Sequence, residues 1–189
     1  IHSNLVALQA VLAVLADEEI DGYLCLGDIV GYGARPNQCC DLMREVGAIC
    51  VRGNHDEAAV DPEKAEWFTA SARACILWTR EQLREDNLEC LRELPLRRIV
   101  DEEITLCHGS VPDPDHYTVS PADAALSFRE MTTRVAFFGH THYAEWFVDS
   151  GDGQLPVEFP MPTGGSVQLR DDRRYLINPG AVGQPRDGN

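Results

Sequence analysis

The stretch "PNQCCDLMREVGAICVRGNHD", residues 36–56, contains a helix signal followed directly by a strand signal. Pro36 opens the first part and Gly47 follows it, which is typical of the two ends of a helix. The run from Gly47 to Val51 predicts a short buried strand that Gly53 ends. Three polar residues, 54–56, come next, where open α/β sheets build their sites. Asn and Asp also favour plain turns, so this stretch alone is compatible with a turn.

The residues before this stretch repeat the same alternation. Residues 3–20 place apolar side chains at 5, 8, 11, 12 and 15, which is close to helical spacing, and Ser3 or Asn4 can serve as N-cap. "DGYLCLGD", residues 21–28, predicts a turn, a short strand and a polar stop. Helix, strand, helix and strand in this order predict βαβ units and a largely parallel sheet.

The rest of the chain predicts further elements of both kinds. Residues 62–94 are expected to be helical, and the core contacts expected there are Trp67, Phe68, Ile76, Leu77, Leu83 and Leu91. We also expect two strands around an acidic turn at 101–103, a helix at 122–131, and strands within 134–142, 143–148 and 175–178.

Composition excludes several classes of protein. The 189 residues suit one domain with a real core, and no apolar run approaches the roughly 20 residues that span a bilayer. The seven cysteines include no CxxC pair, which favours reduced thiols and a cytoplasmic location. The net charge is −15, and no basic face is visible, so long nucleic acid is a disfavoured partner.

Most of the histidines follow predicted strands. His55, His108 and His140 each come within a few residues of an apolar strand and beside a Gly, and His142 follows two residues later. Asp28 has an equivalent position after "YLCLG", His2 precedes the first helix, and only His116 lies in a plain loop. Parallel strands end at one edge, so we expect these side chains to converge. Each residue alone could be a turn or cap residue, but the set favours a metal site.

The types of donor group narrow the choice of metal. Imidazole, carboxylate and carboxamide groups suit Mn, Fe or Zn. No cysteine occupies a strand-stop position, which disfavours a thiolate-rich zinc site. The donors are too many for one ion, and a pair of ions about 3.5–4 Å apart fits them better.

Four motifs in order, "GDIVGYG" (27–33), "GNHD" (53–56), "HG" (108–109) and "GHTH" (139–142), resemble those of the calcineurin-like metallophosphoesterase family. The tail "NPGAVGQPRDG" (178–188) is similar to that of the small bacterial cytoplasmic phosphodiesterases. The resemblance implies an α/β fold, a four-layer α-β-β-α sandwich of two mixed sheets with outer helices, in a single domain over 1–189.

The resemblance also assigns roles to individual residues. It implies that His2 and His142 bind a first metal, that Asp28 bridges both metals, and that Asn54, His108 and His140 bind the second. It implies that His55 is no ligand but stands over the substrate phosphate, oriented by Asp56. The two divalent ions would be Mn, Fe or Zn first, with Mg also compatible.

The resemblance includes one departure. The family's first motif is Asp-x-His, and this chain starts at the middle residue, Ile1. We therefore expect an Asp directly before Ile1, and a domain without its first strand and without one or more last strands after Asn189.

The expected function is hydrolysis of a phosphodiester or phosphomonoester bond by direct attack of metal-bound hydroxide. His55 would stabilise the transition state or protonate the leaving oxygen. The substrate would be a small phosphate ester, with no membrane involved. The alternative is a non-catalytic, metal-stabilised module that binds a nucleotide or a partner. Such a module has no need of His55, so that residue favours the enzyme.

Overall fold

The computed structural model describes residues 1–161, 165–186 and 188, so Asp187 of the tail motif lies outside the described residues. The fold is mixed α/β, and the chain packs as two compact units. The first unit comprises Ile1–Pro95 with Val182–Gln184, and the second comprises Leu96–Ala181 with Pro185–Asn189. Within the described ranges, no helix combines the length and the apolar character needed to cross a membrane.

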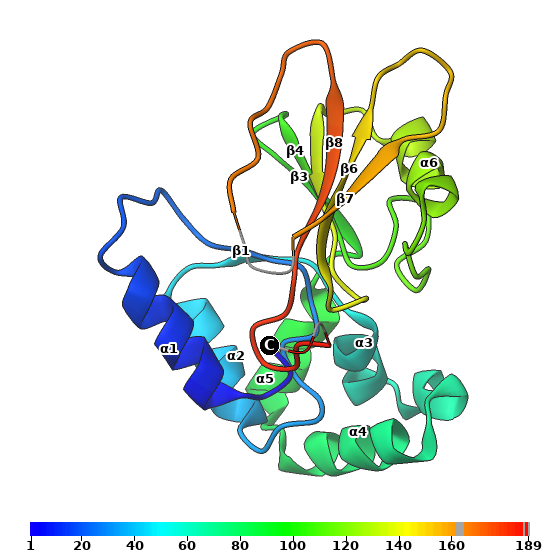
Figure 1. Ribbon diagram of the computed structural model, residues 1–189. Helices are drawn as coiled ribbons and strands as arrows, with labels where there is room; N and C mark the ends of the chain where they lie inside the picture. The colour runs from blue at the N-terminus through cyan, green and yellow to red at the C-terminus, as the bar shows by residue number, and fades with distance from the viewer. Residues whose placement is uncertain (162–164, 187, 189) are drawn as a thin grey trace. The chain divides into compact units, whose positions relative to one another are not determined.

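The first unit joins a small parallel sheet to several helices (Figure 1). Strand β1 (Leu24–Cys25) pairs with β2 (Ile49–Cys50), and Cys25 lies opposite Cys50. The elements are α1 (Leu5–Leu15), β1 (Leu24–Cys25), α2 (Pro36–Glu45), β2 (Ile49–Cys50), α3 (Asn54–Val60), the 3₁₀ helix η1 (Pro62–Trp67), α4 (Ala70–Gln82) and α5 (Glu85–Glu93). The predicted order of helix, strand, helix and strand is confirmed.

Helix α1 begins where the sequence predicts. The Asn4 side chain accepts a hydrogen bond from the Ala7 amide, as an N-cap does. Leu8 is buried, but Val6 and Val14 are 78% and 67% exposed. The apolar residues of α1 therefore reach beyond the core-facing side of the helix.

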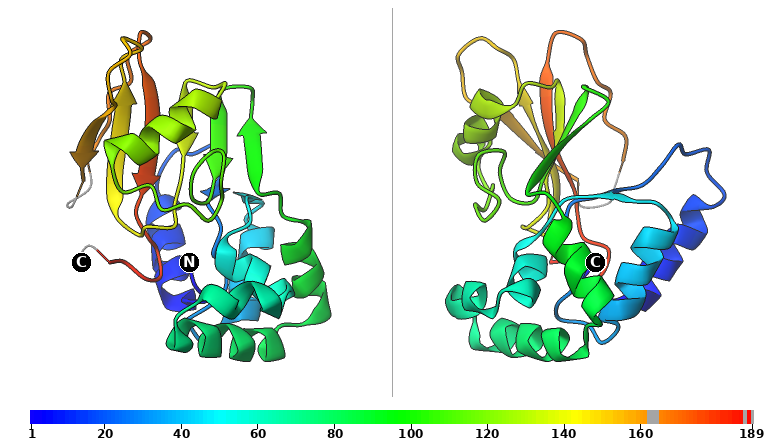
Figure 2. Two further views of the ribbon diagram at one scale, coloured as in Figure 1. Left: turned by 90° about the vertical axis from the view of Figure 1, so that its right-hand side faces the viewer. Right: turned by 180° about the vertical axis from the view of Figure 1, so that it is seen from behind.

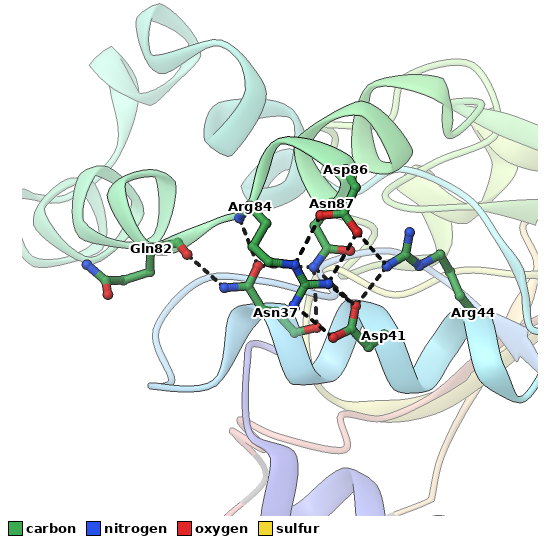
Figure 3. A network of polar contacts seen from close by, with 7 residues as sticks. All are labelled: Asn37, Asp41, Arg44, Gln82, Arg84, Asp86 and Asn87. Carbon is green, nitrogen blue, oxygen red and sulfur yellow. Dashed lines mark hydrogen bonds and ion pairs between the residues drawn. The ribbon is translucent and has the colours of Figure 1, made fainter.

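A network of polar side chains connects α2 to α5 (Figure 3). Asp41 on α2 accepts hydrogen bonds from Arg84, the N-cap of α5, at 2.6 and 3.1 Å. Asn87, which is fully buried, donates to the Asn37 side chain at 3.0 Å. The Arg84 hydrogen bond lowers the pKa of Asp41 below its usual value and so favours the charged carboxylate.

The helical prediction for residues 62–94 is right in type and incomplete in detail. The segment breaks twice, at Phe68–Thr69 and at Leu83–Arg84, where the backbone is extended or nearly so. Ile76, Leu83 and Leu91 are buried and Phe68 packs against the core, as predicted. Trp67 and Leu77 are 93% and 41% exposed, so these two predictions are wrong. Trp67 lies in the 3₁₀ turn η1, which does not follow the 3.6-residue period on which its prediction depends. Leu77 lies on α4 directly after the buried Ile76, one position away from the core-facing side of that helix.

The polar residues after β2 form a helix instead of a plain turn. Gly53 is the N-cap of α3, and the Asp56 carboxylate accepts a hydrogen bond from the Gly53 amide at 3.1 Å. An acidic residue at the third helical position commonly satisfies the N-cap amide in this way. The first turn of α3 therefore holds Asn54 and His55 in fixed positions.

The second unit is a six-stranded mixed sheet with one helix across a face (Figure 2, left). Its elements are β3 (Arg97–Val100), β4 (Ile104–Cys107), α6 (Pro121–Glu130), β5 (Val135–Phe137), β6 (Ala144–Asp149), β7 (Val157–Pro160) and β8 (Arg174–Pro179). The strand order is β3-β4-β5-β8-β6-β7; β4, β5 and β8 are parallel, and the other neighbours pair antiparallel. The predicted hairpin around the acidic turn at 101–103 is confirmed.

The core of the second unit lies between α6 and the sheet. Ala124 and Phe128 of α6 pack in one buried cluster with Phe138, Phe147 and Leu176. The seven cysteines of the chain are all free. Burial raises the pKa of the Cys107 thiol to about 12, which makes it inert near neutral pH.

Candidate metal centre

In the first unit, the ends of the two parallel strands bring polar residues together. Asp28 follows β1 and Asn54 follows β2, so neighbouring strand ends place them in adjacent loops, as predicted. Asp28 is buried, and its Oδ1 accepts a hydrogen bond from the His55 amide at 2.9 Å. The carboxylate therefore lies at the N-terminal end of α3, where a negative charge is favoured.

The loops after β1 and β2 approach so closely that only glycine fits at positions 27 and 53. A Cβ on Gly53 would lie 2.2 Å from Asp28 Oδ1, and one on Gly27 would lie 2.4 Å from the Gly53 amide nitrogen. Both distances are shorter than any real Cβ contact. The glycines of the "GD" and "GNHD" motifs thus allow Asp28 to lie against the start of α3.

His2 is oriented by a backbone carbonyl. Its ring Nδ1 is 3.1 Å from the Val30 carbonyl oxygen, and its Nε2 is 3.4 Å from Asp28 Oδ2. A carbonyl only accepts, so Nδ1 donates to it, and when the ring is neutral Nε2 directs a lone pair towards the carboxylate. Two lone pairs at this distance repel, and either a proton or a cation between them is needed.

His55 lies in a group of aromatic rings. Its ring centroid is 4.6–4.8 Å from those of His2, Tyr32 and Phe68, and the residue is 5% exposed. Gly31 leaves room for the ring, because a Cβ there would lie 2.4 Å from His55 Nδ1. The His55 ring is therefore fixed by packing from several sides.

Asp56 is completely buried and fixes two loops. Its Oδ1 accepts from the Val30 amide and its Oδ2 from the Gly53 amide, both at 3.1 Å. These bonds connect the loop after β1 to the start of α3. The prediction that Asp56 orients the His55 ring stays a prediction.

In the second unit, two parallel strand ends bring histidines together. His108 follows β4 and His140 follows its neighbour β5, and both side chains are buried. His140 Nδ1 lies 3.1 Å from His108 Nε2, and the Gly139 amide donates to the His108 carbonyl at 2.8 Å. The predicted convergence of strand ends thus holds within each sheet.

The loop that carries His140 and His142 is held by a side chain from β8. Asn178, which is 1% exposed, donates through Nδ2 to the Gly139 carbonyl and to Thr141 Oγ1, both at 2.9 Å. Its Oδ1 accepts from the Gly180 amide at 2.9 Å. The sequence pattern does not indicate this role, although the "NPG" of the tail motif contains the residue.

Backbone strain is concentrated at the predicted ligands. Four of them have φ angles in the left-handed region: His2 at 55°, Asp28 at 51°, His140 at 65° and His142 at 65°. Non-glycine residues rarely adopt this conformation, and where they do they cluster at functional sites.

Each unit has a buried donor cluster, His2 with Asp28 in the first and His108 with His140 in the second. The spacing of the donor atoms in both clusters fits a divalent metal. Two ligand atoms about 2.1 Å from one ion, at angles between octahedral and tetrahedral, lie about 3.0–3.4 Å apart. The His108–His140 nitrogens are 3.1 Å apart, and the His2–Asp28 atoms are 3.4 Å apart. In each unit, buried side chains could therefore contribute donors to an ion.

His116 lies outside these clusters, as the sequence predicts. Its Nε2 is 3.2 Å from Asp123 Oδ1 at the start of α6. A hydrogen bond from the Ser120 hydroxyl is the main cause that lowers the pKa of Asp123. The contact with Asp123 gives His116 a structural partner in its own unit.

Comparisons with known proteins assign the chain to a family. The family model described as the calcineurin-like phosphoesterase superfamily domain matches residues 1–189. This chain belongs to the calcineurin-like phosphoesterase superfamily. The predicted resemblance is thereby confirmed, and the superfamily consists of phosphoesterases that use divalent metals.

Individual relatives agree with this membership. A metallophosphoesterase from Sphaerobacter thermophilus is 40% identical with a TM-score of 0.81, over 100% of this chain and 76% of that one. The uncharacterized protein MJ0912 of Methanocaldococcus jannaschii is 37% identical over 100% of this chain and 75% of its own length. The hypothetical protein PH1004 of Pyrococcus horikoshii shares only the fold, with 19% identity and a TM-score of 0.68 over 96% of this chain and 72% of that one.

Proposed function

We propose that this member of the superfamily hydrolyses a phosphodiester or phosphomonoester bond with two divalent metal ions. The proposed ligands are His2, Asp28, Asn54, His108, His140 and His142. The observation that carries the proposal is the pair of buried donor clusters with four strained, left-handed ligand residues. Divalent ions in this donor set would polarise the phosphoryl oxygens and lower the pKa of a bound water towards 7.

The residues of the chain would divide the remaining work. Asp28 is held by the His55 amide and by the close approach of Gly53, so its carboxylate is preorganised for a bridging role. His2 presents Nε2 because its Nδ1 donates to Val30. His55 would contact the substrate phosphate and stabilise the developing charge or protonate the leaving oxygen.

The test is a panel of phosphate monoesters and diesters, assayed with protein reconstituted separately with Mn, Fe, Zn or Mg. Asp28→Asn is the matched control, because it keeps the shape of the side chain and removes the bridging charge. We expect turnover of at least one ester class by the native chain and loss of turnover in Asp28→Asn. Metal binding by the native chain without turnover of any ester would support the non-catalytic module instead.

A further inference from the structure

A pocket in the first unit borders one of the proposed metal ligands. Its volume is about 670 Å³, within the range of small-molecule sites. The polar side chains that line it are His2, Ser3, Asn4, Tyr32, Arg35 and Gln38, and Leu5 and Val6 add apolar wall. A molecule in this pocket would therefore extend from the neighbourhood of His2.

Two helices begin at this pocket. Asn4 is the N-cap of α1 and Arg35 is the N-cap of α2. The first turn of a helix leaves amides without an intrahelical acceptor, and its end carries partial positive charge. Neither helix has an acidic residue in its first turn, and none of the described residues that line the pocket is acidic. In a chain of net charge −15, the pocket is a locally positive region.

Arg35 adds a full positive charge to this region. A cation is disfavoured at a helix N-terminus, and the side chain of Arg35 does not cap α2. Among the described residues, the Arg35 guanidinium has no hydrogen bond or ion pair, although its backbone amide donates to the Ser3 carbonyl at 3.1 Å. Arg35 is exposed and lines the pocket, so its charge is available to an anion bound there.

Ser3 provides an independent observation. It is 1% exposed, and its Oγ has no hydrogen-bond partner among the described residues. Buried hydroxyl groups are normally paired, because desolvation without a partner is unfavourable. Its backbone also has a left-handed φ of 56°. The pocket wall thus contains both an unsatisfied buried donor and an unpaired cation.

We infer that this pocket binds a second anionic group of the substrate, a phosphate or a carboxylate. The inference rests on the proposed function, and it defines the substrate class as a small organic phosphate ester with two anionic groups. The scissile phosphate would lie at the metal ligands, and the second group would contact Arg35, Ser3 and the two helix starts. The carbon chain between them would lie against Tyr32 and Leu5.

Three esters with the same carbon chain test this inference: propyl phosphate, propane-1,3-diol bisphosphate and 3-phosphonooxypropanoate. In the metal-reconstituted chain, we expect a KM about tenfold lower for an ester with a second anionic group, because a charge-assisted contact has about this value. A preference for the bisphosphate identifies a phosphate site, and a preference for the propanoate identifies a carboxylate site. Equal KM values for all three esters would overturn the inference.

Arg35→Gln should raise the KM of the doubly anionic ester about tenfold and leave that of propyl phosphate within about twofold. Arg129→Gln removes the same charge from an exposed position on α6 and should alter neither KM. An equal rise for all three esters in Arg35→Gln would show a general charge effect and would contradict the inference.

Ser3→Ala gives a readout that a structural role would not produce. Removal of an unpaired buried hydroxyl should keep or raise the melting temperature of the substrate-free protein, while the KM of the doubly anionic ester rises. A lower melting temperature with unchanged KM would mean that Ser3 is structural.

If no ester is hydrolysed, the proposed function fails. Calorimetric titration with the bisphosphate, in native chain and Arg35→Gln, then still tests the pocket.

Discussion

At the scale of single residues, His55 is the residue whose role most sharply separates an enzyme from a binding module. Its ring packs against those of His2, Tyr32 and Phe68. Truncation to Ala would remove these contacts along with the imidazole, so His55→Gln, which keeps most of the volume, is the cleaner variant.

We expect His55→Gln to keep its metal content and to lose about 10²–10⁴ in rate, the usual contribution of a positioned general acid. The loss should be smallest for nitrophenyl esters, whose leaving groups depart without a proton. Metal analysis and kcat on esters of graded leaving-group pKa measure both effects. A variant that loses a metal ion would make His55 a ligand, and one with the native rate on every ester would remove it from the mechanism.

Gly53 is the residue on which the position of Asp28 depends. Gly53→Ala places a methyl group 2.2 Å from Asp28 Oδ1, so either the carboxylate or the start of α3 must move. We expect a metal affinity at least tenfold weaker and a lower melting temperature, measured by calorimetric titration and thermal unfolding.

Gly22→Ala is the control for the Gly53 substitution. A Cβ on Gly22 would meet no heavy atom within 4 Å, and the φ of this residue is not in the left-handed region. The substitution should therefore change neither property appreciably. Native metal affinity in Gly53→Ala would show that the close approach does not position the carboxylate.

At the scale of elements, β8 positions the loop that follows β5. Asn178 on β8 bonds both Gly139 and Thr141, and these residues flank His140 and precede His142. Two left-handed residues in so short a loop need such support. Asn178 is thus a positioning residue for the histidines.

Asn178→Asp preserves the shape and the acceptor for Gly180 but replaces the Nδ2 donor with an oxygen that faces the Gly139 carbonyl. We expect weaker metal binding, a lower melting temperature and a changed absorption spectrum of the cobalt-substituted protein. Thr141→Val removes only one of the two Nδ2 contacts and should have a smaller effect in each measurement. A native cobalt spectrum in Asn178→Asp would contradict the positioning role.

The elements differ in how far the sequence predicts them. The start of α1 is marked by its N-cap Asn4 and the start of α2 by Pro36. Both signals are local in the sequence, so both helices were predictable. The segment 62–94 was less so, because the extended breaks at Phe68–Thr69 and Leu83–Arg84 depend on packing. Trp67 illustrates the limit, since a periodic pattern cannot show that a 3₁₀ turn leaves the ring in solvent.

The candidate site was predictable where the proposed ligands follow strands. Asp28 and His108 occur directly after apolar runs beside glycine, and the parallel pairing of β1–β2 and β4–β5 explains why that position is informative. The role of Asn178 was not predictable from periodicity, because its contacts depend on the strand order β5-β8-β6. The strained φ of His140 was likewise visible only in the structure.

At the scale of the whole molecule, the proposed ligands are divided between the two units. His2, Asp28 and Asn54 belong to the first, and His108, His140 and His142 belong to the second. If ligands from both units hold the metals, metal binding must stabilise each unit. At free metal 100 times Kd, one ion contributes about 2.7 kcal/mol, which raises the melting temperature of a chain of this size by about 5–10 °C.

The three tryptophans allow each unit to be followed separately. Trp67 and Trp78 lie in the first unit and Trp146 lies in the second. In Trp146→Phe the fluorescence reports on the first unit, and in the double variant Trp67→Phe, Trp78→Phe it reports on the second. We expect both reporters to show the same increase in melting temperature when manganese is added to chelator-treated protein, because in the proposed centre each unit would contribute donors to the same ions. Asp28→Asn should reduce the increase in both, whereas His116→Gln, whose imidazole contacts Asp123 and not the clusters, should retain it. An increase confined to one unit would mean that the ions bind to its ligands alone, and the dinuclear centre proposed here would be wrong.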